Sequence, residues 1–306
     1  MDKLNYSIII PHKDIPHLLQ RCLDSIPRRD DLQIIIVDDN SNPNIVDFNN
    51  FPGIDDPIVN IIYDKNGKGV GAARNIGLDY MLNMNLDSKW LIFADADDFF
   101  NPCFEETLEK FKNDENDLIF FRTNSAISDT LEPSFNNNYV DDKVNLVQTN
   151  KDFDLLRYNV GPVWGRFIKY SIIKKNKLRF PEIRSNEDTL FSAKLGKLSN
   201  KIDICNQIIY CYTSRQNSLV TNQERDYIVT RYFASKEVTE YLQKETTTGY
   251  LYTQYNVIWF WTILATNYPW KGIIELPELW RLCNKKDILN SMPTIIKRII
   301  KKTFYR

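Results

Sequence analysis

Polar and acidic side chains follow three apolar runs in this sequence, each with the length and composition of a buried β-strand. Ligands of open α/β sheets bind in the crevice at the carboxyl ends of the strands, so residues at these places are candidates for chemistry. The first run is followed by Pro11, His12, Lys13 and Asp14, the second by Asp38 and Asp39, and a later one by Asp95, Asp97 and Asp98.

The last of these groups has the composition of a metal site. Three carboxylates within four residues repel one another unless a cation or hydrogen bonds balance them. The one-residue spacing of Asp95 and Asp97 points both side chains to the same side of an extended backbone. Mg²⁺ and Mn²⁺ take oxygen ligands and bind through one or two carboxylates plus substrate phosphates. We therefore predict a divalent metal at Asp95 and Asp97 rather than a capping turn before the helix-like segment NPCFEETLEKF.

Other polar residues are suited to contacts with a nucleotide. The Asp39 carboxylate can accept hydrogen bonds from a base or a ribose, whereas Asp38 could equally close an Asx turn within DDNSN. Arg74 is a candidate for contact with phosphate or base, and a surface salt bridge is the alternative. Its segment, NGKGVGAARNIG, runs GxGxG after the third strand, which differs from a dinucleotide fingerprint, and no GxxxxGK[ST] loop occurs in the sequence.

A second acidic pair, Glu187 and Asp188, opens the segment EDTLFSAKLGKL. This segment has the periodicity of a helix, and acidic residues in the first turn interact favourably with the helix dipole. From the local pattern alone, that placement is sufficient to explain both acids.

The elements that would position these residues alternate between strand and helix. Strand, helix and strand within ~30 residues form a βαβ unit, which implies a right-handed crossover and a parallel sheet. We therefore predict an α/β fold with a mostly parallel central sheet flanked by helices, and a C-terminal helical extension. The expected strands are 6–10, 33–37, 58–63, 90–98 and 117–123, the expected helices include 69–84 and a segment from 187, and the chain becomes helical and aromatic after about residue 224.

The composition excludes several classes of function. Lys and Arg (39) nearly balance Asp and Glu (40), so no basic field attracts nucleic acid. The five cysteines are dispersed and lack CxxC spacing, which indicates a reducing compartment and no zinc site. No run approaches the ~20 apolar residues of a membrane span, and the N-terminal apolar run is too short for a signal peptide. We expect a cytoplasmic protein.

The C-terminal segment 292–306 is basic and amphipathic. Isoleucines at positions 295, 296, 299 and 300 share one helical face, and lysines and an arginine occupy the other. Such a helix could lie at an anionic membrane surface, or it could pack its isoleucine face on the body of the protein with a solvated basic side. Both readings remain open.

Seven blocks of the sequence resemble, in the same order, the motifs of family-2 glycosyltransferases of the GT-A fold, a Rossmann-like α/β fold. The resemblance covers roughly residues 5–220 and implies an enzyme of bacterial surface-polysaccharide assembly. Such an enzyme moves a hexose or N-acetylhexosamine from a nucleotide sugar to a saccharide or lipid-linked saccharide acceptor. The blocks are SIIIPHKD with LLQRCLDSI, IIIVDDNS, GVGAARNIGL, WLIFADADDFF, GPVWGRFIKYSII, RSNEDTLFSAKL and YCYTSRQNSLV.

The resemblance also implies roles in donor binding. Pro11, His12 and Asp14 would line the base and ribose, and Asp39 and Arg74 would contact the base. The family more often has a small residue, Tyr and Asn at positions 12 to 14, so a tyrosine that stacks on uracil is absent here. Uridine is nevertheless the expected nucleoside.

Asp95 and Asp97 would hold the metal and the donor, with Asp97 in direct coordination to Mn²⁺ or Mg²⁺. Arg215 would approach the diphosphate, and it is the only cation of its block, since Thr213 stands where an Arg is common. Trp164 would shape the sugar or acceptor pocket.

Asp188 would be the general base, supported by Glu187. An alcohol is a poor nucleophile at neutral pH, so a carboxylate should take its proton as the new bond forms. With one base and no evident covalent nucleophile, the resemblance implies a single displacement that inverts the anomeric centre. It divides the chain into a nucleotide-sugar-binding half (1–116), an acceptor-binding and catalytic half (117–224) and a helical C-terminal region (225–306).

Two other functions fit the sequence less well. A sugar-nucleotidyltransferase should carry a Gly-rich loop with Arg and Lys directly after the first strand, where this sequence has PHKDIPH. A non-catalytic partner that only binds a nucleotide sugar would not need the metal-site acids and the base, and Asp95, Asp97 and Asp188 are all present.

Overall fold

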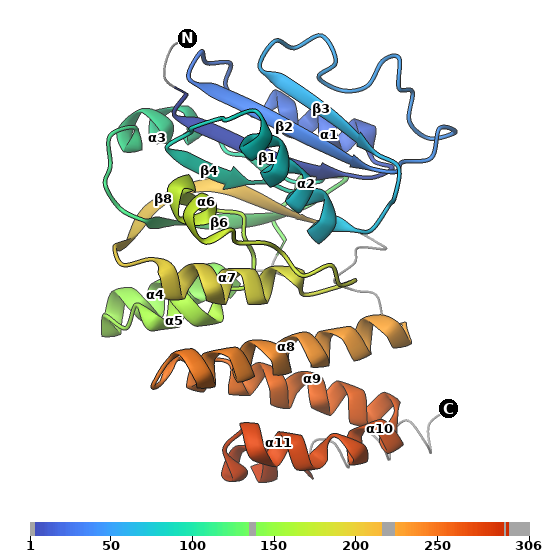
Figure 1. The fold of residues 1–306 in the computed structure, drawn as a ribbon, viewed down its shortest axis with the longest axis vertical. Helices are drawn as coiled ribbons and strands as arrows, with labels where there is room; N and C mark the ends of the chain where they lie inside the picture. The colour runs from blue at the N-terminus through green and yellow to red at the C-terminus, as the bar shows by residue number, and fades with distance from the viewer. Residues whose placement is uncertain (1–3, 135–138, 216–223, 291, 294–306) are drawn as a thin grey trace.

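The computed structural model describes residues 4–134, 139–215, 224–290 and 292–293. These residues form an eight-stranded mixed sheet with helices on both faces, followed by a stack of C-terminal helices (Figure 1). The strand order is β3-β2-β1-β4-β7-β6-β8-β5. The predicted α/β fold with a C-terminal helical extension is confirmed.

The first half of the sheet is parallel. Strands β2, β1 and β4 contain runs of isoleucine, valine and phenylalanine, which suit strands buried on both faces. Strand β1 pairs with β2 on one side and β4 on the other, and β3 pairs with β2. Their carboxyl ends therefore lie along one edge. The bounds are Tyr6–His12 for β1, Leu32–Asp39 for β2, Val59–Asp64 for β3 and Trp90–Phe93 for β4.

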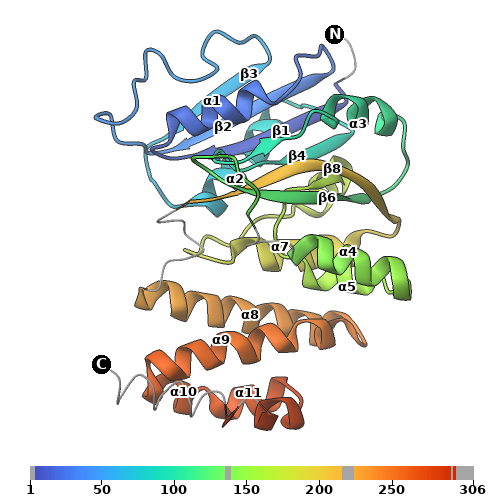
Figure 2. The ribbon, with the colours of Figure 1, turned by 180° about the vertical axis from the view of Figure 1, so that it is seen from behind.

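Helices α1 (Pro16–Asp24) and α2 (Val70–Asn83) cover opposite faces of this half, as Figures 1 and 2 show together. Helix α2 packs closely because Gly77 faces the sheet, and a methyl group there would lie 2.8 Å from Cγ2 of Ile9. Close packing fixes the position of Arg74, one turn earlier on the same helix.

The second half of the sheet is mixed. Strand β7 is antiparallel to β4 and β6, β8 runs parallel to β6, and the short β5 pairs antiparallel with β8. This arrangement carries the end of β8 back to the residues that follow β4. The bounds are Phe99–Phe100 for β5, Leu118–Ile127 for β6, Arg166–Lys169 for β7 and Ile202–Ser214 for β8.

Helix α7 lies between the sheet and the C-terminal helices (Figure 1). Leu190 and Ala193 of α7 pack against Val238 and Leu242 of α8, and the helices beyond have a core of their own. No helix of the described chain is long and apolar enough to cross a membrane. The remaining bounds are α3 Phe104–Phe111, α4 Tyr139–Asn150, α5 Asp154–Asn159, α6 Tyr170–Asn176, α7 Glu187–Leu198, α8 Arg225–Glu245, η2 Gly249–Tyr252, α9 Gln254–Asn267, α10 Pro269–Ile274 and α11 Leu276–Leu282.

The structure corrects one predicted element. The strand expected to continue to residue 98 ends at Phe93, and Asp95, Asp97 and Asp98 lie in a turn closed by a hydrogen bond from the Asp98 N–H to the Asp95 carbonyl. The extended backbone predicted for Asp95 and Asp97 is therefore wrong. Helix α3 begins only at Phe104, with Cys103 at its N-cap, so none of the acids caps it. The predicted basic tail lies, from residue 294 onward, outside the described residues.

We expect Gly196→Ala to lower the free energy of unfolding by about 1–3 kcal/mol, because its methyl group would collide with the main-chain carbonyl of Arg157 in α5. This is the net loss, after the ~1 kcal/mol that alanine gains over glycine in helix propensity. Urea unfolding measures the difference. The exposed Asn83→Ala at the end of α2 is the control, with a change within about 0.5 kcal/mol. Equal stability of the two variants would contradict the tight packing of α7 on α5.

Candidate functional site

Hydrogen bonds from β8 hold the turn that follows β4, called here the acid turn, which contains Asp95, Asp97 and Asp98. The Tyr210 hydroxyl donates a hydrogen bond to Asp98 Oδ2 at 2.7 Å and accepts one from the Asp95 N–H at 2.9 Å. The Thr213 N–H donates to Asp98 Oδ1, and the Thr213 hydroxyl donates to the Asp97 carbonyl. Burial and the neighbouring Asp97 raise the pKa of Asp98 well above its ordinary value. Asp98 therefore fixes the turn, and Asp95 and Asp97 are left for other contacts.

Arg74 joins this turn to the start of helix α7. Its guanidinium donates to Asp95 Oδ1 at 2.7 Å and to Glu187 Oε1 at 2.8 Å, and the residue is 3% exposed. Gly71 allows this approach, since a methyl group there would lie 2.8 Å from the Pro181 carbonyl and 3.0 Å from Cγ of Glu187. The surface salt bridge considered for Arg74 is thus excluded by its burial.

Asp97 faces a second arginine. Arg215 Nε donates to Asp97 Oδ2 at 2.9 Å, and the Asp97 side chain is 22% exposed. Burial, followed by the charge of Asp95, raises the pKa of Asp97. A divalent cation would relieve this crowding of negative charge, and two carboxylates are a suitable protein contribution to a site completed by phosphate oxygens. Among the described residues no group of three His, Cys, Asp or Glu side chains could hold a metal ion by itself.

The ends of β1 and β2 form a polar wall. His12 Nε2 accepts a hydrogen bond from the Ile15 N–H, so its Nδ1 carries the proton and donates to Asp38 at 2.8 Å. Burial alone would raise the pKa of Asp38, but the hydrogen bonds from His12 and Ser41 hold it below its ordinary value. Both ring nitrogens of His12 are thus used within the protein, and Asp38 closes the turn to Ser41, as its Asx-turn alternative predicts.

Asp39 and Asp14 belong to the same edge. Both Asp39 carboxylate oxygens lie 3.1 Å from the Gly69 N–H, and burial raises the pKa of this group. Asp14 has a positive φ of 57° and accepts a hydrogen bond from the Asn42 N–H. Pro11 is buried in β1. The loops after β1, β2 and β3 are therefore tied together.

Asp188 lies in the first turn of α7 and is partly buried. Burial, followed by the charge of Glu187, raises the pKa of Asp188 to about 7. No described residue donates a hydrogen bond to its carboxylate, so its lone pairs are available. A carboxylate with a pKa near neutral pH is suited to take a proton from a hydroxyl.

Trp164 is nearly buried behind the acid turn. Its indole stacks on Tyr210, with ring centroids 5.3 Å apart, and on Tyr212 at 5.7 Å. It therefore supports the ring that holds the turn. Its role in an acceptor pocket stays a prediction.

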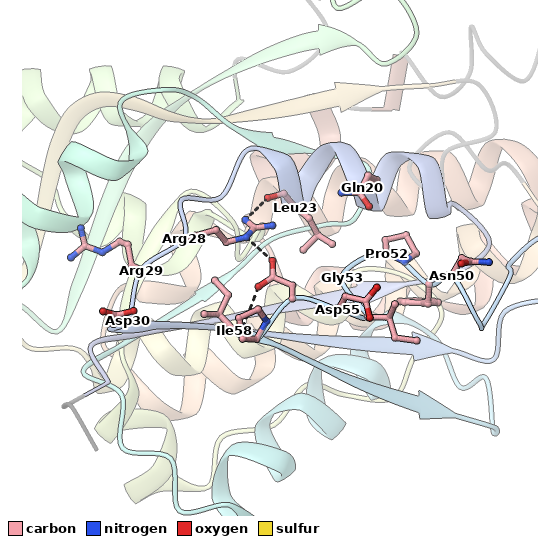
Figure 3. Close-up of a pocket in the computed structure, with 14 residues that line it drawn as sticks. Gln20, Leu23, Arg28, Arg29, Asp30, Asn50, Pro52, Gly53, Asp55 and Ile58 are labelled. Carbon is pink, nitrogen blue, oxygen red and sulfur yellow. Dashed lines mark hydrogen bonds and ion pairs between the residues drawn. The ribbon is translucent and has the colours of Figure 1, made fainter.

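A cavity of about 670 Å³ lies elsewhere, between α1 and the loop that precedes β3. Figure 3 shows Arg28 in this cavity, bonded to the Leu23 carbonyl and to a carboxylate, which is that of Asp56. None of the predicted site residues lines it. It is found where β2 and β3 begin, at the opposite edge from the acids.

Sequence reasoning missed three contributors. Tyr210 and Thr213 hold the acid turn, and the fully buried Arg166 donates to the loop beside Asp188. One signal was available for Arg166, a charged residue at the start of the apolar stretch RFIKYSII. The bonds of Tyr210 depend on strand pairing that the local pattern does not reveal.

Comparison with known proteins agrees with this geometry. The model of the family described as glycosyl transferase family 2 matches residues 7–176, more than half of the chain. The chain belongs to glycosyl transferase family 2. Among curated relatives, the glycosyltransferase GlyA of Streptococcus pneumoniae serotype 4 is 25% identical over 232 residues, which is 70% of this chain and 31% of the relative.

Two Bacillus relatives extend this comparison. The uncharacterized glycosyltransferase EpsJ of Bacillus subtilis is 24% identical over 70% of this chain and 62% of its own length. The poly(ribitol-phosphate) beta-glucosyltransferase of Bacillus spizizenii is 26% identical over 70% of this chain and 33% of its own length. The matched part of this chain thus spans between 31% and 62% of the length of these three relatives.

Solved structures of low identity share the fold. S. aureus TarS 1–349 in complex with UDP-GlcNAc has a TM-score of 0.62 at 16% identity, covering 98% of this chain and 82% of that one. The mannosyltransferase PcManGT from Pyrobaculum calidifontis, in complex with GDP-Man and Mn²⁺, has a TM-score of 0.55 at 12% identity, with 99% and 88% coverage. The predicted GT-A fold is thereby confirmed.

We expect Arg74→Met to lower the free energy of unfolding by about 3–5 kcal/mol, because it leaves Glu187 and Asp95 without their buried partner. Chemical denaturation measures the loss. Arg179→Met, which breaks the more exposed pair with Asp79, is the matched control and should cost less than about 1 kcal/mol. Similar losses in both variants would show that the Arg74 bridge does not hold α2 to α7.

We expect Asp188→Asn to raise the melting temperature, and to raise it more at pH 8 than at pH 4. Folded Asp188 keeps its proton up to about pH 7, whereas an unfolded aspartate loses it near pH ~4. As the pH rises through this window, the folded state retains the proton longer, so stability falls. The exposed Asp55→Asn is the control and should show no such pH dependence. An unchanged difference between pH 4 and pH 8 would contradict the raised pKa of Asp188.

Proposed function

We propose that this chain transfers a sugar from a nucleotide-diphosphate sugar to an acceptor hydroxyl, with inversion at the anomeric carbon. One observation carries the proposal: Arg74 links Asp95 of the acid turn to Glu187, next to Asp188. A group suited to hold a diphosphate and a group suited to deprotonate a hydroxyl are thus connected by one buried cation. Transfer of a sugar in one displacement requires both.

The donor is proposed to be linked to UDP. Its base and ribose would lie against the wall formed by Pro11, His12 and Asp14, with a contact from Asp39. Arg74, predicted from the sequence as a further contact of the base, is 3% exposed and bonded to Asp95 and Glu187, so we propose that it holds the acid turn instead. TarS, a neighbour by fold, has been solved with UDP-GlcNAc, while the mannosyltransferase neighbour was solved with GDP-Man. The choice of UDP and the hexosyl or N-acetylhexosaminyl type are part of the proposal.

The diphosphate is proposed to rest between Asp97 and Arg215. A divalent Mn²⁺ or Mg²⁺, when bound by Asp97 and Asp95, would stabilise the negative charge of the departing diphosphate. Arg215 already lies 2.9 Å from Asp97, so its guanidinium is within reach of the same phosphates. Tyr210 and Thr213 would keep the turn in place while negative charge develops on the departing diphosphate.

The acceptor hydroxyl is proposed to lose its proton to Asp188. Its raised pKa makes this carboxylate a stronger base than an ordinary aspartate, and its free oxygens can accept the proton. The negative charge of Glu187 is compensated by Arg74 and contributes to that raised pKa. Attack from the side opposite to the diphosphate would invert the anomeric centre.

The acceptor is proposed to be a saccharide or a lipid-linked saccharide of a bacterial surface polysaccharide, with Trp164 beside its pocket. The name of the Bacillus spizizenii relative, a poly(ribitol-phosphate) beta-glucosyltransferase, supports a surface polymer as the class of product. A cytoplasmic location, with contact to the inner face of the membrane through residues 292–306, completes the proposal.

We expect the protein to release nucleoside diphosphate from one of a panel of nucleotide sugars, in a reaction that requires Mn²⁺ or Mg²⁺ and stops with EDTA. Asp97→Ala should abolish the metal response. Asp188→Asn should lower kcat by ~10²–10⁴-fold while donor binding persists. The wild-type rate should rise with pH up to an apparent pKa near 7, because only ionised Asp188 is a base.

Asp55→Asn, an exposed change, is the control and should keep wild-type kcat. Donor binding without turnover by any acceptor mixture would favour a non-catalytic binding partner. Formation of a nucleotide sugar from a nucleoside triphosphate and a sugar phosphate would favour a sugar-nucleotidyltransferase. Undiminished turnover by Asp188→Asn would remove Asp188 as the base.

A further inference from the structure

The loop between α5 and β7 lies against the Asp188 carboxylate. A methyl group built on Gly161 would lie 3.8 and 3.9 Å from the two Asp188 carboxylate oxygens, and 2.9 Å from Cγ2 of Thr189. The Ser192 hydroxyl, one helical turn further along α7, donates to the Gly161 carbonyl at 2.6 Å. The main chain at Gly161 therefore forms one wall of the space around Asp188.

Arg166 holds this loop through hydrogen bonds to its main-chain carbonyls. It is the first residue of β7, is 1% exposed, and its guanidinium carbon lies 5.0 Å from the centre of the Phe120 ring. Its Nη2 donates to the carbonyls of Val160, at 2.9 Å, and Gly161, at 3.3 Å, and also to that of Pro162. One buried guanidinium thus gathers three successive carbonyls of the loop that contacts Asp188.

We propose that Arg166 is a positioning residue for the general base. It holds the main chain at 160–162 against Asp188, and it supplies a fixed positive charge near the Asp188 carboxylate. This inference rests on the proposed function of Asp188. Arg166 has no assigned role in donor, metal or acceptor binding, and it acts through the loop.

Four charged groups from four elements surround Asp188. Glu187 on α7 and Asp95 after β4 raise its pKa, whereas Arg74 on α2 and Arg166 on β7 lower it, with burial as the largest influence. Arg74 is already engaged by Glu187 and Asp95. Loss of the Arg166 charge would therefore raise the pKa of Asp188 further.

The shape of the arginine side chain matters as much as its charge. All three bonds come from one terminal nitrogen, Nη2, at the end of a planar guanidinium. A lysine ammonium is a compact point charge on a shorter, flexible stem. Lysine at position 166 would therefore keep the positive charge but would not place its nitrogen where Nη2 reaches the three carbonyls. Methionine would lose both. The two functions of Arg166 can therefore be separated.

The experiment compares Arg166→Lys, Arg166→Met and Ser192→Ala with the wild type, using thermal unfolding, donor affinity, kcat and its pH profile. We expect Arg166→Lys and Ser192→Ala to keep the donor Kd and the wild-type pH profile but to lose about 10- to 100-fold in kcat, because the loop beside the base shifts. Arg166→Met should lose as much in kcat and also move the acidic limb of the profile to higher pH.

A folded Arg166→Met variant with wild-type kcat and pH profile would overturn the inference. Should that variant fail to unfold cooperatively, wild-type kcat in both Arg166→Lys and Ser192→Ala would overturn it equally. If all three variants also lost donor affinity in parallel, Arg166 would be a residue that stabilises the fold in general, and the inference would again be overturned. Failure of the proposed function looks different: the wild type would then show no turnover, or Asp188→Asn would retain it.

Discussion

The site depends on one buried arginine shared by two carboxylates. Arg74 is almost inaccessible to water, and its charge is compensated by Asp95 on one side and Glu187 on the other. An uncompensated charge at such a depth would be costly, so the end of β4, the start of α2 and the start of α7 are fixed relative to one another. These are the segments that carry the candidate diphosphate and base residues.

Around this bridge, neutral groups hold the acids in place. Tyr210 and Thr213 of β8 bind Asp98, and Trp164 stacks on the Tyr210 ring, so the turn is supported by a strand far away in the sequence. Because Asp98 takes these hydrogen bonds, Asp95 and Asp97 are free to pair with arginines. Within four residues, Asp98 thus accepts hydrogen bonds from neutral groups of β8, whereas Asp95 and Asp97 accept them from arginines.

The C-terminal helices also bear on the site, although none of the predicted site residues lies in them. Leu190 and Ala193 bury one face of α7 against α8, two residues beyond Asp188. Arg231 of α8 donates to the Ser185 hydroxyl, just before α7 begins. The helix that carries Asp188 is therefore packed between the sheet and the helical extension, as Figure 1 shows.

Much of the parallel half of the fold was predictable from sequence. The runs of β-branched residues in β1 and β2 and the helical patterns at 69–84 and from 187 are local signals, and a buried strand or a helix is determined largely by such signals. The end of β4 was mistaken because apolar residues continue through Ala94 and Ala96, while the turn is set by bonds from β8. The burial of Arg74 and Arg166 could not be inferred from the charge totals, because the numbers of acidic and basic residues do not say where in the fold each one lies.

The sequence by itself determined the fold class, the family and the positions of the acids, because motif spacing and hydrophobic period are written along the chain. Only the tertiary structure decided which carboxylates pair with arginines, which carboxylates have a raised pKa, and which groups surround Asp188. These properties depend on desolvation and on distances between charges from different elements, such as Arg74 on α2, Glu187 on α7 and Arg166 on β7. Electrostatic energy varies with distance and burial, and neither is encoded in the spacing of residues along the chain.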